Sequence, residues 1–271
     1  MQNWFNKIIL ITGAGSGIGQ ALAKLFAQEG AKLILTGLHA EDLDATCSQL
    51  GNSVLLSKVS DVSKKEDWLS LVEEIQKKTD YIDVIINNAG VSAFDFFNDM
   101  PEEMFDKVMN VNLNGVVYGC RYLLPLLEKS PRGMIVNISS IFGLICMPMA
   151  TPYHASKFAV RGFTEGLKQD LLYQNKNIDV ICVMPGGVKT NIVNHGETSK
   201  LNKNQFAQHF NKIARTSPDK AAKVIGNGMR KRTFRVLIGP DAKFVNILYK
   251  VMPTHYYKVF NFLFEVKKFL P

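Results

Sequence analysis

The sequence has few cysteines and no metal-binding pattern. Cys47, Cys120, Cys146 and Cys182 are its only cysteines, and no two of them form a C-x-x-C pair. Disulfide frameworks and structural zinc sites depend on clustered cysteines. We therefore expect reduced thiols, no bound metal and a cytoplasmic location.

Long apolar runs and export signals are also absent. No uninterrupted apolar run reaches the roughly 18 residues that a membrane-spanning helix requires. The apolar stretch at residues 7–12 follows almost directly on the first residue, without a basic segment and a small-residue cleavage site before it. The sequence therefore predicts neither export nor a membrane span.

Acidic residues are scarce in the last quarter of the chain. Residues 200–271 hold 15 Lys and Arg against 3 Asp and Glu, whereas residues 1–199 hold 17 against 21. The net charge of +8 therefore belongs to the C-terminal part. No recognisable nucleic-acid-binding motif accompanies this charge, so we expect no nucleic-acid partner.

Short apolar segments alternate with helix-length periodic segments along most of the chain. A βαβ rhythm with strands rich in Ile, Val and Leu is typical of a parallel sheet buried on both faces. We expect a single doubly wound, Rossmann-like α/β domain over residues 1–240 and a C-terminal helical extension over residues 241–271. The predicted strands are 7–12, 32–36, 53–59, 83–87, 133–139, 178–184 and 234–238.

A glycine-rich segment follows the first predicted strand and precedes a helix-like segment at 20–28. Its sequence is Thr-Gly-Ala-Gly-Ser-Gly-Ile-Gly, from Thr12 to Gly19. Glycines permit a tight turn and a close approach of the backbone to a pyrophosphate, which then lies at the positive end of the helix. The strand-glycine-helix order predicts dinucleotide binding.

A tyrosine and a lysine stand four residues apart in the segment Thr151 to Lys157. Pro152 favours a helix start, and positions i and i+4 share one helix face, so Tyr153 and Lys157 would lie one turn apart. A nearby ammonium can lower the pKa of a phenol by about 1–3 units. We therefore expect Tyr153 to act as an acid or base at neutral pH.

Three motifs in combination resemble the short-chain dehydrogenase/reductase family. They are the Gly-x-x-x-Gly-x-Gly spacing that begins at Gly13, the sequence Asn-Asn-Ala-Gly that begins at Asn87, and Tyr153-x-x-x-Lys157. The resemblance covers residues 7–240. It implies an NAD(P)-dependent oxidoreductase that acts on an alcohol or a carbonyl compound.

The resemblance also assigns residues to the cofactor. It implies that Asp61 and Val62 contact the adenine and that the end of the fourth strand lies beside the adenosine ribose. The segment after the sixth strand would close over the nicotinamide. The implied contacts are Gly13, Ser16, Gly17, Ile18, Gly19, Asp61, Val62, Asn88, Ala89, Gly90, Tyr153, Lys157, Pro185, Gly186, Val188 and Thr190.

Four residues match the catalytic positions of the family. Asn112 matches the asparagine that holds a water in a proton relay, with Asn110 as the competing assignment. Ser140 stands 13 residues before the tyrosine, and Ser139 is the runner-up. The resemblance implies that Ser140 binds the substrate oxygen, that Tyr153 transfers a proton, and that Lys157 lowers the pKa of the phenol and contacts the ribose.

The residues after the second predicted strand leave the choice of nicotinamide open. Dinucleotide folds that prefer NAD often place an acid there, and those that prefer NADP place a basic residue nearby. This chain has Gly37 and Leu38 at these positions, followed by His39. Without the acid we expect a slight preference for NADP, with His39 either a contact or an ordinary loop residue.

The segments expected to line the substrate cleft are largely apolar. They are 91–99, 141–151 and 191–215, and the first two predict an apolar alcohol or ketone as substrate. The apolar candidates are Phe94, Phe96, Phe97, Phe142, Leu144, Ile145, Met147 and Met149.

The basic, aromatic extension over residues 241–271 has three possible destinations. It can pack over the cleft, pack against another subunit or lie on an anionic membrane surface. The family resemblance implies a homodimer or homotetramer that pairs the helices near 110–129 and 153–174. The alternative to an enzyme is a cofactor-sensing regulator of the same fold, which would normally lack one of the four catalytic residues, whereas all four are present.

Overall fold

The centre of the molecule is a seven-stranded parallel sheet. The computed structural model describes residues 4–190, 192, 196–198 and 214–263, and the sheet order is β3-β2-β1-β4-β5-β6-β7. All seven predicted strands are confirmed to within about one residue at each end. They are β1 (Ile8–Thr12), β2 (Lys32–Gly37), β3 (Val54–Val59), β4 (Val84–Asn87), β5 (Gly133–Ile138), β6 (Ile178–Pro185) and β7 (Arg235–Ile238).

Both faces of the sheet are covered, as the apolar strands predict. In β1 the side chains of Ile9 and Ile11 join one apolar cluster, and those of Ile8 and Leu10 join another. This alternation follows from the two-residue period of a strand. The strand is buried along its whole length because each face meets a layer of helices.

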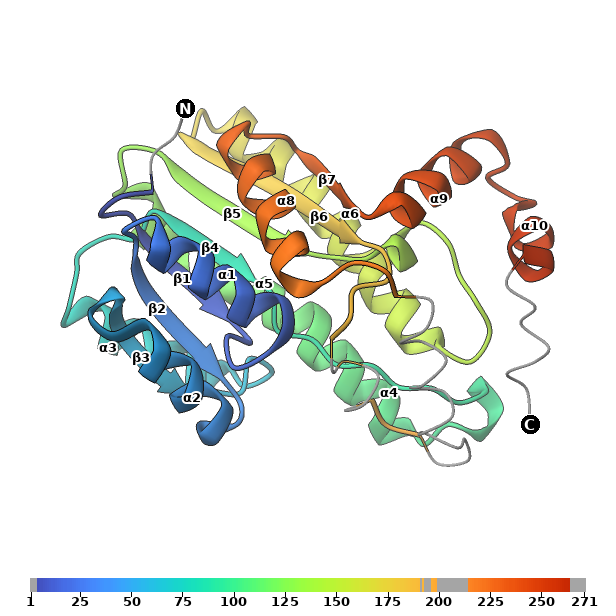
Figure 1. Ribbon diagram of the computed structural model, residues 1–271, viewed down its shortest axis with the longest axis horizontal. Helices are drawn as coiled ribbons and strands as arrows, with labels where there is room; N and C mark the ends of the chain where they lie inside the picture. Colours follow the sequence, from blue (N-terminus) through green and yellow to red (C-terminus); the bar gives the residue numbers. More distant parts are fainter. Residues whose placement is uncertain (1–3, 191, 193–195, 199–213, 264–271) are drawn as a thin grey trace.

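Two layers of helices enclose the sheet (Figure 1). On one face lie α1 (Gly17–Gln28), α2 (Ala40–Leu50) and α8 (Pro218–Arg230), whose side chains join the cluster of Ile9. On the other lie α3 (Lys65–Gln76), α5 (Gly115–Glu128) and α6 (Thr151–Tyr173). Helix α4 (Glu102–Met109) continues through a π-helical turn (Asn110–Asn114) directly into α5.

The direction in which the chain progresses through the sheet reverses between β1 and β4. From β1 the chain builds β2 and β3 on one side, and it then returns to place β4 on the other side of β1. In open parallel sheets ligands bind outside the carboxyl ends of the strands at such a reversal. This topology therefore places a crevice beside the glycine turn that follows β1.

The C-terminal extension begins as helix α9 (Pro240–Val251), which packs against the sheet domain. Ala242 and Val245 are buried in a third apolar cluster with a short 3₁₀ turn (Ile141–Gly143) and β6. The hydroxyl of Tyr256, in α10 (Tyr256–Leu263), accepts a hydrogen bond from the backbone N–H of Cys146 at 3.0 Å. The two helices lie at the end of the molecule away from α2 and α3 (Figure 1).

The helices and the cysteines bear on the expectations about membrane spans and thiols. Every helix in the described parts of the chain is too short or too polar to cross a bilayer. All four cysteines are free thiols, and Cys120 and Cys182 are buried in the apolar interior.

Candidate active site

A cleft of about 580 Å³ opens at the carboxyl ends of the strands, at the reversal between β1 and β4. One end is bordered by the glycine turn and the ends of β2 and β3, and the other by the start of α6 and the turn after β5. All but two of the predicted site residues line this single cleft: Gly13, Ser16, Gly17, Ile18, His39, Asp61, Val62, Asn88, Ala89, Gly90, Ser140, Tyr153, Lys157, Pro185, Gly186, Val188 and Thr190. Gly19 and Asn112 lie behind its wall.

The glycine turn between β1 and α1 has the shape that a phosphate cradle requires. Gly13 and Gly17 have φ angles of +64° and +55°, which residues with a Cβ rarely adopt. A Cβ on Gly19 would collide with the carbonyl oxygen of Gly13. The turn leads into the positive N-terminus of α1 at Gly17, so these residues fit the pyrophosphate of a dinucleotide.

Asn88 fastens the end of β4 to the glycine turn. Its Nδ2 donates to the carbonyl of Thr12 at 2.9 Å and to that of Gly13 at 3.3 Å. In return the Thr12 hydroxyl accepts hydrogen bonds from the backbone N–H groups of Asn88 and Ala89. This reciprocal pairing holds the two strand ends on either side of the crevice in register.

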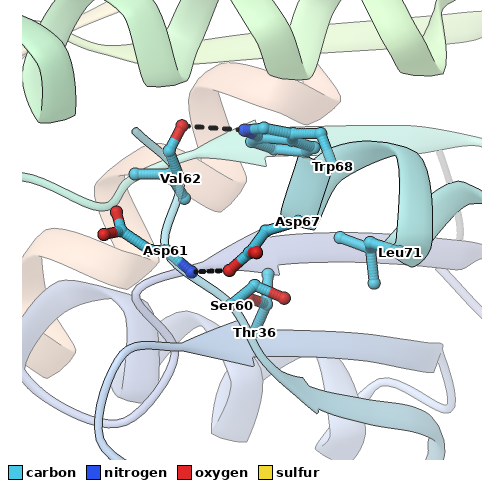
Figure 2. Close-up of a pocket in the computed structure, with 7 residues that line it drawn as sticks. All are labelled: Thr36, Ser60, Asp61, Val62, Asp67, Trp68 and Leu71. Carbon is cyan, nitrogen blue, oxygen red and sulfur yellow. Dashed lines mark hydrogen bonds between the residues drawn. The ribbon is translucent and has the colours of Figure 1, made fainter. Parts of the chain in front are cut away.

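Asp61 and Val62 form the floor of the cleft next to the ends of β2 and β3. The backbone N–H of Asp61 donates to the carboxylate of Asp67 at 2.7 Å, and the indole of Trp68 donates to the carbonyl of Val62 at 2.9 Å (Figure 2). The Asp61 carboxylate accepts hydrogen bonds from the backbone N–H and hydroxyl of Ser63. Helix α3 therefore fixes this loop from below.

Tyr153, Ser140 and Lys157 meet at the other end of the cleft. The side chain of Ser140 lies near the Tyr153 hydroxyl, and Lys157 Nζ lies 5.6 Å from the centroid of the Tyr153 ring. Lys157 Nζ also donates to the carbonyl of Ile138 at 3.1 Å. Ser139, the alternative to Ser140, instead donates its hydroxyl to the carbonyl of Lys157 at 2.8 Å and so anchors α6.

Asn112 lies in the π-helical turn and is fully buried. Its Oδ1 accepts from the backbone N–H of Val91, and its Nδ2 donates to the Val91 carbonyl and to the hydroxyl of Ser156. Both amide hydrogens are therefore used within the protein and neither is left for a water. The competing Asn110 is exposed and bonds to Asn114.

The expectation that the pKa of Tyr153 lies below its ordinary value is wrong for this structure. Burial within the protein raises the pKa of Tyr153 to about 12, although the side chain of Ser140 acts in the opposite direction. Burial also lowers the pKa of Lys157 to about 8. Removal from water disfavours both charged forms, so at neutral pH Tyr153 carries its proton.

Residues 185–190 are held by hydrogen bonds with the C-terminal part of the chain. The backbone N–H of Gly187 donates to Asp241 Oδ2 at 2.5 Å, and that of Lys189 donates to the carbonyl of Thr216 at 2.9 Å. Asp241 also lines the cleft, and sequence reasoning missed it. The available signal was its position as the only acid in the first turn of a helix that starts at Pro240.

The apolar residues expected at the substrate end fall into three groups. Phe94, Phe142 and Met147 line the cleft, together with Val91 and Ile192. Leu144, Ile145 and Met149 are instead buried in the interior, and Phe96 and Phe97 are exposed on the surface, so these five were wrongly expected to line the cleft. Most of residues 191–215 lie outside the described part of the chain.

Comparisons with known proteins agree with this geometry. A family model for short chain dehydrogenases matches residues 7–200. A Mycobacterium tuberculosis protein that carries the name oxidoreductase SadH is 36% identical over 264 residues, which cover 96% of this chain and 95% of the relative.

Two solved structures are also similar. A Burkholderia phymatum short chain dehydrogenase/reductase in complex with NAD has a TM-score of 0.86 and 26% identity, covering 93% of this chain and 96% of that one. A Brucella melitensis 3-ketoacyl-(acyl-carrier-protein) reductase complexed with NADH has a TM-score of 0.75 and 25% identity, covering 87% and 96%. The chain therefore belongs to the short chain dehydrogenase family and is an NAD(P)-dependent oxidoreductase.

Proposed function

We propose that this enzyme interconverts an apolar secondary alcohol and its ketone, or an apolar aldehyde, with Asn112, Ser140, Tyr153 and Lys157 as its catalytic group. The observation that carries the proposal is that the glycine turn and the pair of Tyr153 and Ser140 border one continuous cleft. When bound, the nicotinamide supplies or accepts the hydride. The protein must then manage one proton and one developing negative charge on oxygen.

Tyr153 and Ser140 would perform these two tasks. Both residues line the cleft and their hydroxyls lie near each other, so a substrate oxygen between them can accept a hydrogen bond from each. Ser140 orients and stabilises the oxygen, and Tyr153, protonated at neutral pH, gives its proton as the charge develops. This arrangement favours the reduction of a carbonyl group near neutral pH.

Lys157 would act on the tyrosine through its charge, and Asn112 would act by positioning the surrounding backbone. Lys157 Nζ lies over the Tyr153 ring and is buried, so its positive charge stabilises negative charge on the phenol oxygen after proton transfer. The side chain of Asn112 connects the segment after β4 to helix α6 through hydrogen bonds with Val91 and Ser156. Since its side-chain amide is used in this way, we assign any water that it holds to its backbone carbonyl.

Apolar side chains around the reacting groups favour an apolar substrate. The apolar cleft surface beyond Tyr153 is formed by residues from three separate segments, the last of which is α9 with Val245. A hydrophobic substrate would bury its apolar surface against these side chains and would cover few polar groups of the cleft. These side chains are Val91, Phe94, Ile141, Phe142, Met147 and Val245.

A panel of substrates tests this proposal. We expect NAD(P)H-dependent reduction of lipophilic ketones and aldehydes, with kcat/KM rising as apolar carbons are added and with hydrophilic sugars turned over far less well. Absorbance of the reduced nicotinamide measures the rate, and a Ser140→Ala variant provides the control for site-specific turnover. Turnover of sugars in preference to every apolar compound would contradict the substrate assignment.

A catalytically silent regulator is the alternative function. Such a protein would use the nicotinamide site without the proton-transfer group, yet Tyr153, Ser140 and Lys157 are assembled at the cleft. No observation in the described structure favours this alternative.

The charged side chains that line the cleft do not support the slight preference for NADP expected from the sequence. NADP differs from NAD by a phosphate, which basic side chains bind best. Among the described residues that line the cleft, the only Lys or Arg side chains are Lys107 and Lys157. Lys107 pairs with Glu197 at 2.5 Å, and Lys157 lies beside Tyr153.

We also propose a homodimer or homotetramer that pairs α5 and α6 of neighbouring subunits, and a cytoplasmic location. Leu172 and Tyr173 at the end of α6 are 58% and 91% exposed, which supports contact with another copy through this part of the helix. The free thiols of the described structure support a reducing compartment.

The outer face of α9 supports the proposal of peripheral contact with an anionic membrane surface. While Ala242 and Val245 face the interior, Phe244, Ile247 and Val251 are 47%, 61% and 73% exposed. From residue 242 to 264 the sequence contains lysines and no acid. An exposed apolar stripe flanked by lysines complements an anionic lipid surface.

Sedimentation with vesicles tests this contact. We expect the enzyme to sediment with phosphatidylglycerol vesicles at low salt, less so at high salt, and not with phosphatidylcholine vesicles. The double variant Ile247→Asp, Val251→Asp should stay in the supernatant, because two carboxylates on the stripe oppose both apolar insertion and anionic lipid. The matched control Leu69→Asp alters an exposed leucine on α3 and should sediment like the parent.

Two results would contradict the membrane contact. One is a parent enzyme that remains in the supernatant with anionic vesicles at low salt. The other is an oligomer, measured by light scattering, that the double variant dissociates while vesicle binding persists. In the second case the stripe belongs to a contact between copies of the chain.

A further inference from the structure

The end of β2 leaves open space where many NAD-binding relatives carry a carboxylate. Gly37 closes this strand and lines the cleft. A Cβ placed on Gly37 would meet its nearest neighbour, the backbone nitrogen of Gly15, at 3.8 Å and side-chain atoms of Leu43 at 3.9 Å. These are ordinary contact distances, so the side of the cleft at Gly37 has room for a side chain that the sequence does not supply.

A carboxylate reaches the same rim from the next helix. Asp42 lies in the first turn of α2, is exposed and lines the cleft. A Cβ on Gly15 would lie 2.9 Å from the Cβ of Asp42, so the phosphate turn and Asp42 are in close contact. The absence of a side chain at Gly15 allows Asp42 to approach.

The charges around this rim are all of one sign. The cleft-lining residues near Gly15 and Gly37 include the carboxylates of Asp42 and Asp61 and no Lys or Arg within the described structure. Asp61 already accepts two hydrogen bonds from Ser63. No described residue makes a hydrogen bond or an ion pair with the Asp42 carboxylate, which leaves it available to a ligand.

We propose that Asp42 replaces the acid missing from the end of β2 and makes the enzyme prefer NAD over NADP. In dinucleotide-binding folds an acid at this edge accepts a hydrogen bond from the ribose 2′-OH. The same carboxylate repels a 2′-phosphate, which carries close to two negative charges at neutral pH. The preference is therefore opposite to the one expected from the sequence, because Asp42 stands five residues beyond the usual position.

Removing the carboxylate of Asp42 tests its assignment to the ribose 2′-OH. The assignment rests on the nicotinamide binding of the family. Dissociation constants for NADH and NADPH, from titration of nicotinamide fluorescence, provide a readout that does not depend on turnover. We expect the parent to bind NADH at least about tenfold more tightly than NADPH, and Asp42→Asn to remove most of that ratio, because both the charge-assisted hydrogen bond to the ribose and the repulsion of the 2′-phosphate are lost. Adding Leu38→Arg to Asp42→Asn should reverse it.

Two further variants show whether a changed binding ratio comes from loss of the Asp42 carboxylate or from a general disturbance of α2. The double variant Gly37→Asp, Asp42→Asn should regain the preference for NADH, since Gly37 has room for a side chain and no positive φ. Glu41→Gln changes the adjacent acid of the same first turn, which does not line the cleft, and should keep the parent ratio.

Three outcomes would overturn the proposal. They are a parent that binds NADPH more tightly, an Asp42→Asn variant with the same ratio as Glu41→Gln, and a Gly37→Asp, Asp42→Asn variant without recovery. A parent that binds neither dinucleotide would be a different result. It would contradict the nicotinamide site itself and leave no preference to assign to Asp42.

Discussion

Replacing Tyr153 with phenylalanine is expected to lower kcat by about 10²–10⁴-fold, the range typical of a lost general acid or base. The dissociation constant for the nicotinamide should change little. The hydroxyl is the only atom removed, and the ring keeps its edge-to-face contact with Phe142, at a centroid distance of 6.3 Å. Stopped assays with an apolar ketone and fluorescence titration of the cofactor measure the two quantities separately.

A matched control shows whether the loss belongs to this hydroxyl. Tyr118→Phe removes a phenol from α5, outside the cleft, where the ring lies against Tyr122. Its kcat should equal that of the parent. If Tyr153→Phe retained turnover within a few-fold of the parent, the proton would have to come from another group, and Ser140 would be the first to examine.

Replacing Lys157 with methionine is expected to lower activity and to raise stability. Lys157 is 3% exposed, and burial lowers its pKa from an ordinary 10.5 to about 8. At pH 7 the folded protein holds a buried ammonium at a cost on the order of 3 kcal/mol, because each pKa unit corresponds to about 1.36 kcal/mol. Methionine fills a similar volume without the charge, so the free energy of unfolding should rise by about 1–3 kcal/mol.

The pH dependence of stability checks the cause of this gain. Below pH 8 both the folded and the unfolded chain bind the Lys157 proton, and the whole cost is present. Between pH 8 and 10.5 the unfolded chain binds more protons than the folded one, so the contribution of Lys157 to stability rises with pH. The advantage of Lys157→Met should therefore shrink across that window in urea unfolding experiments.

The activity of Lys157→Met should fall by about 10²-fold or more, because the buried positive charge that stabilises the phenolate is lost. Lys168→Met is the matched control on the same helix. Lys168 Nζ lies 4.1 Å from the ring centroid of Phe234 and does not line the cleft, so its loss should leave kcat unchanged and should not raise stability. Equal stabilisation by both variants would contradict burial of the Lys157 charge as the cause.

The parts of this structure that follow from local patterns could be predicted from the sequence. The apolar strands and their order along the chain define the sheet, and the glycine turn needs only the residues from Thr12 to Gly19. The positions of Tyr153 and Lys157 also follow, since one helical turn separates them whatever surrounds the helix. Neighbouring residues in the sequence determine each of these features.

Features that depend on packing could not be predicted. Asp42 meets the glycine turn only because α2 packs where Gly15 leaves room, and Asp241 reaches Gly187 across 54 residues of chain. The pKa of Tyr153 was misjudged because the charge of Lys157 is visible in the sequence, whereas the loss of water around both groups is not. The choice between Ser139 and Ser140 likewise needed the fold, which directs Ser139 to the backbone of α6.

The hydrogen bond between Asp241 and Gly187 connects helix α9, whose outer face is exposed, to residues 185–190 at the cleft. Within two turns of α9, the carboxylate that holds residues 185–190 is followed by Phe244 and Ile247 on the outside. If a bilayer orders that helix, thermodynamic reciprocity requires lipid and dinucleotide to change each other's affinity by the same factor. Attachment to a surface would then change the affinity of the enzyme for its coenzyme.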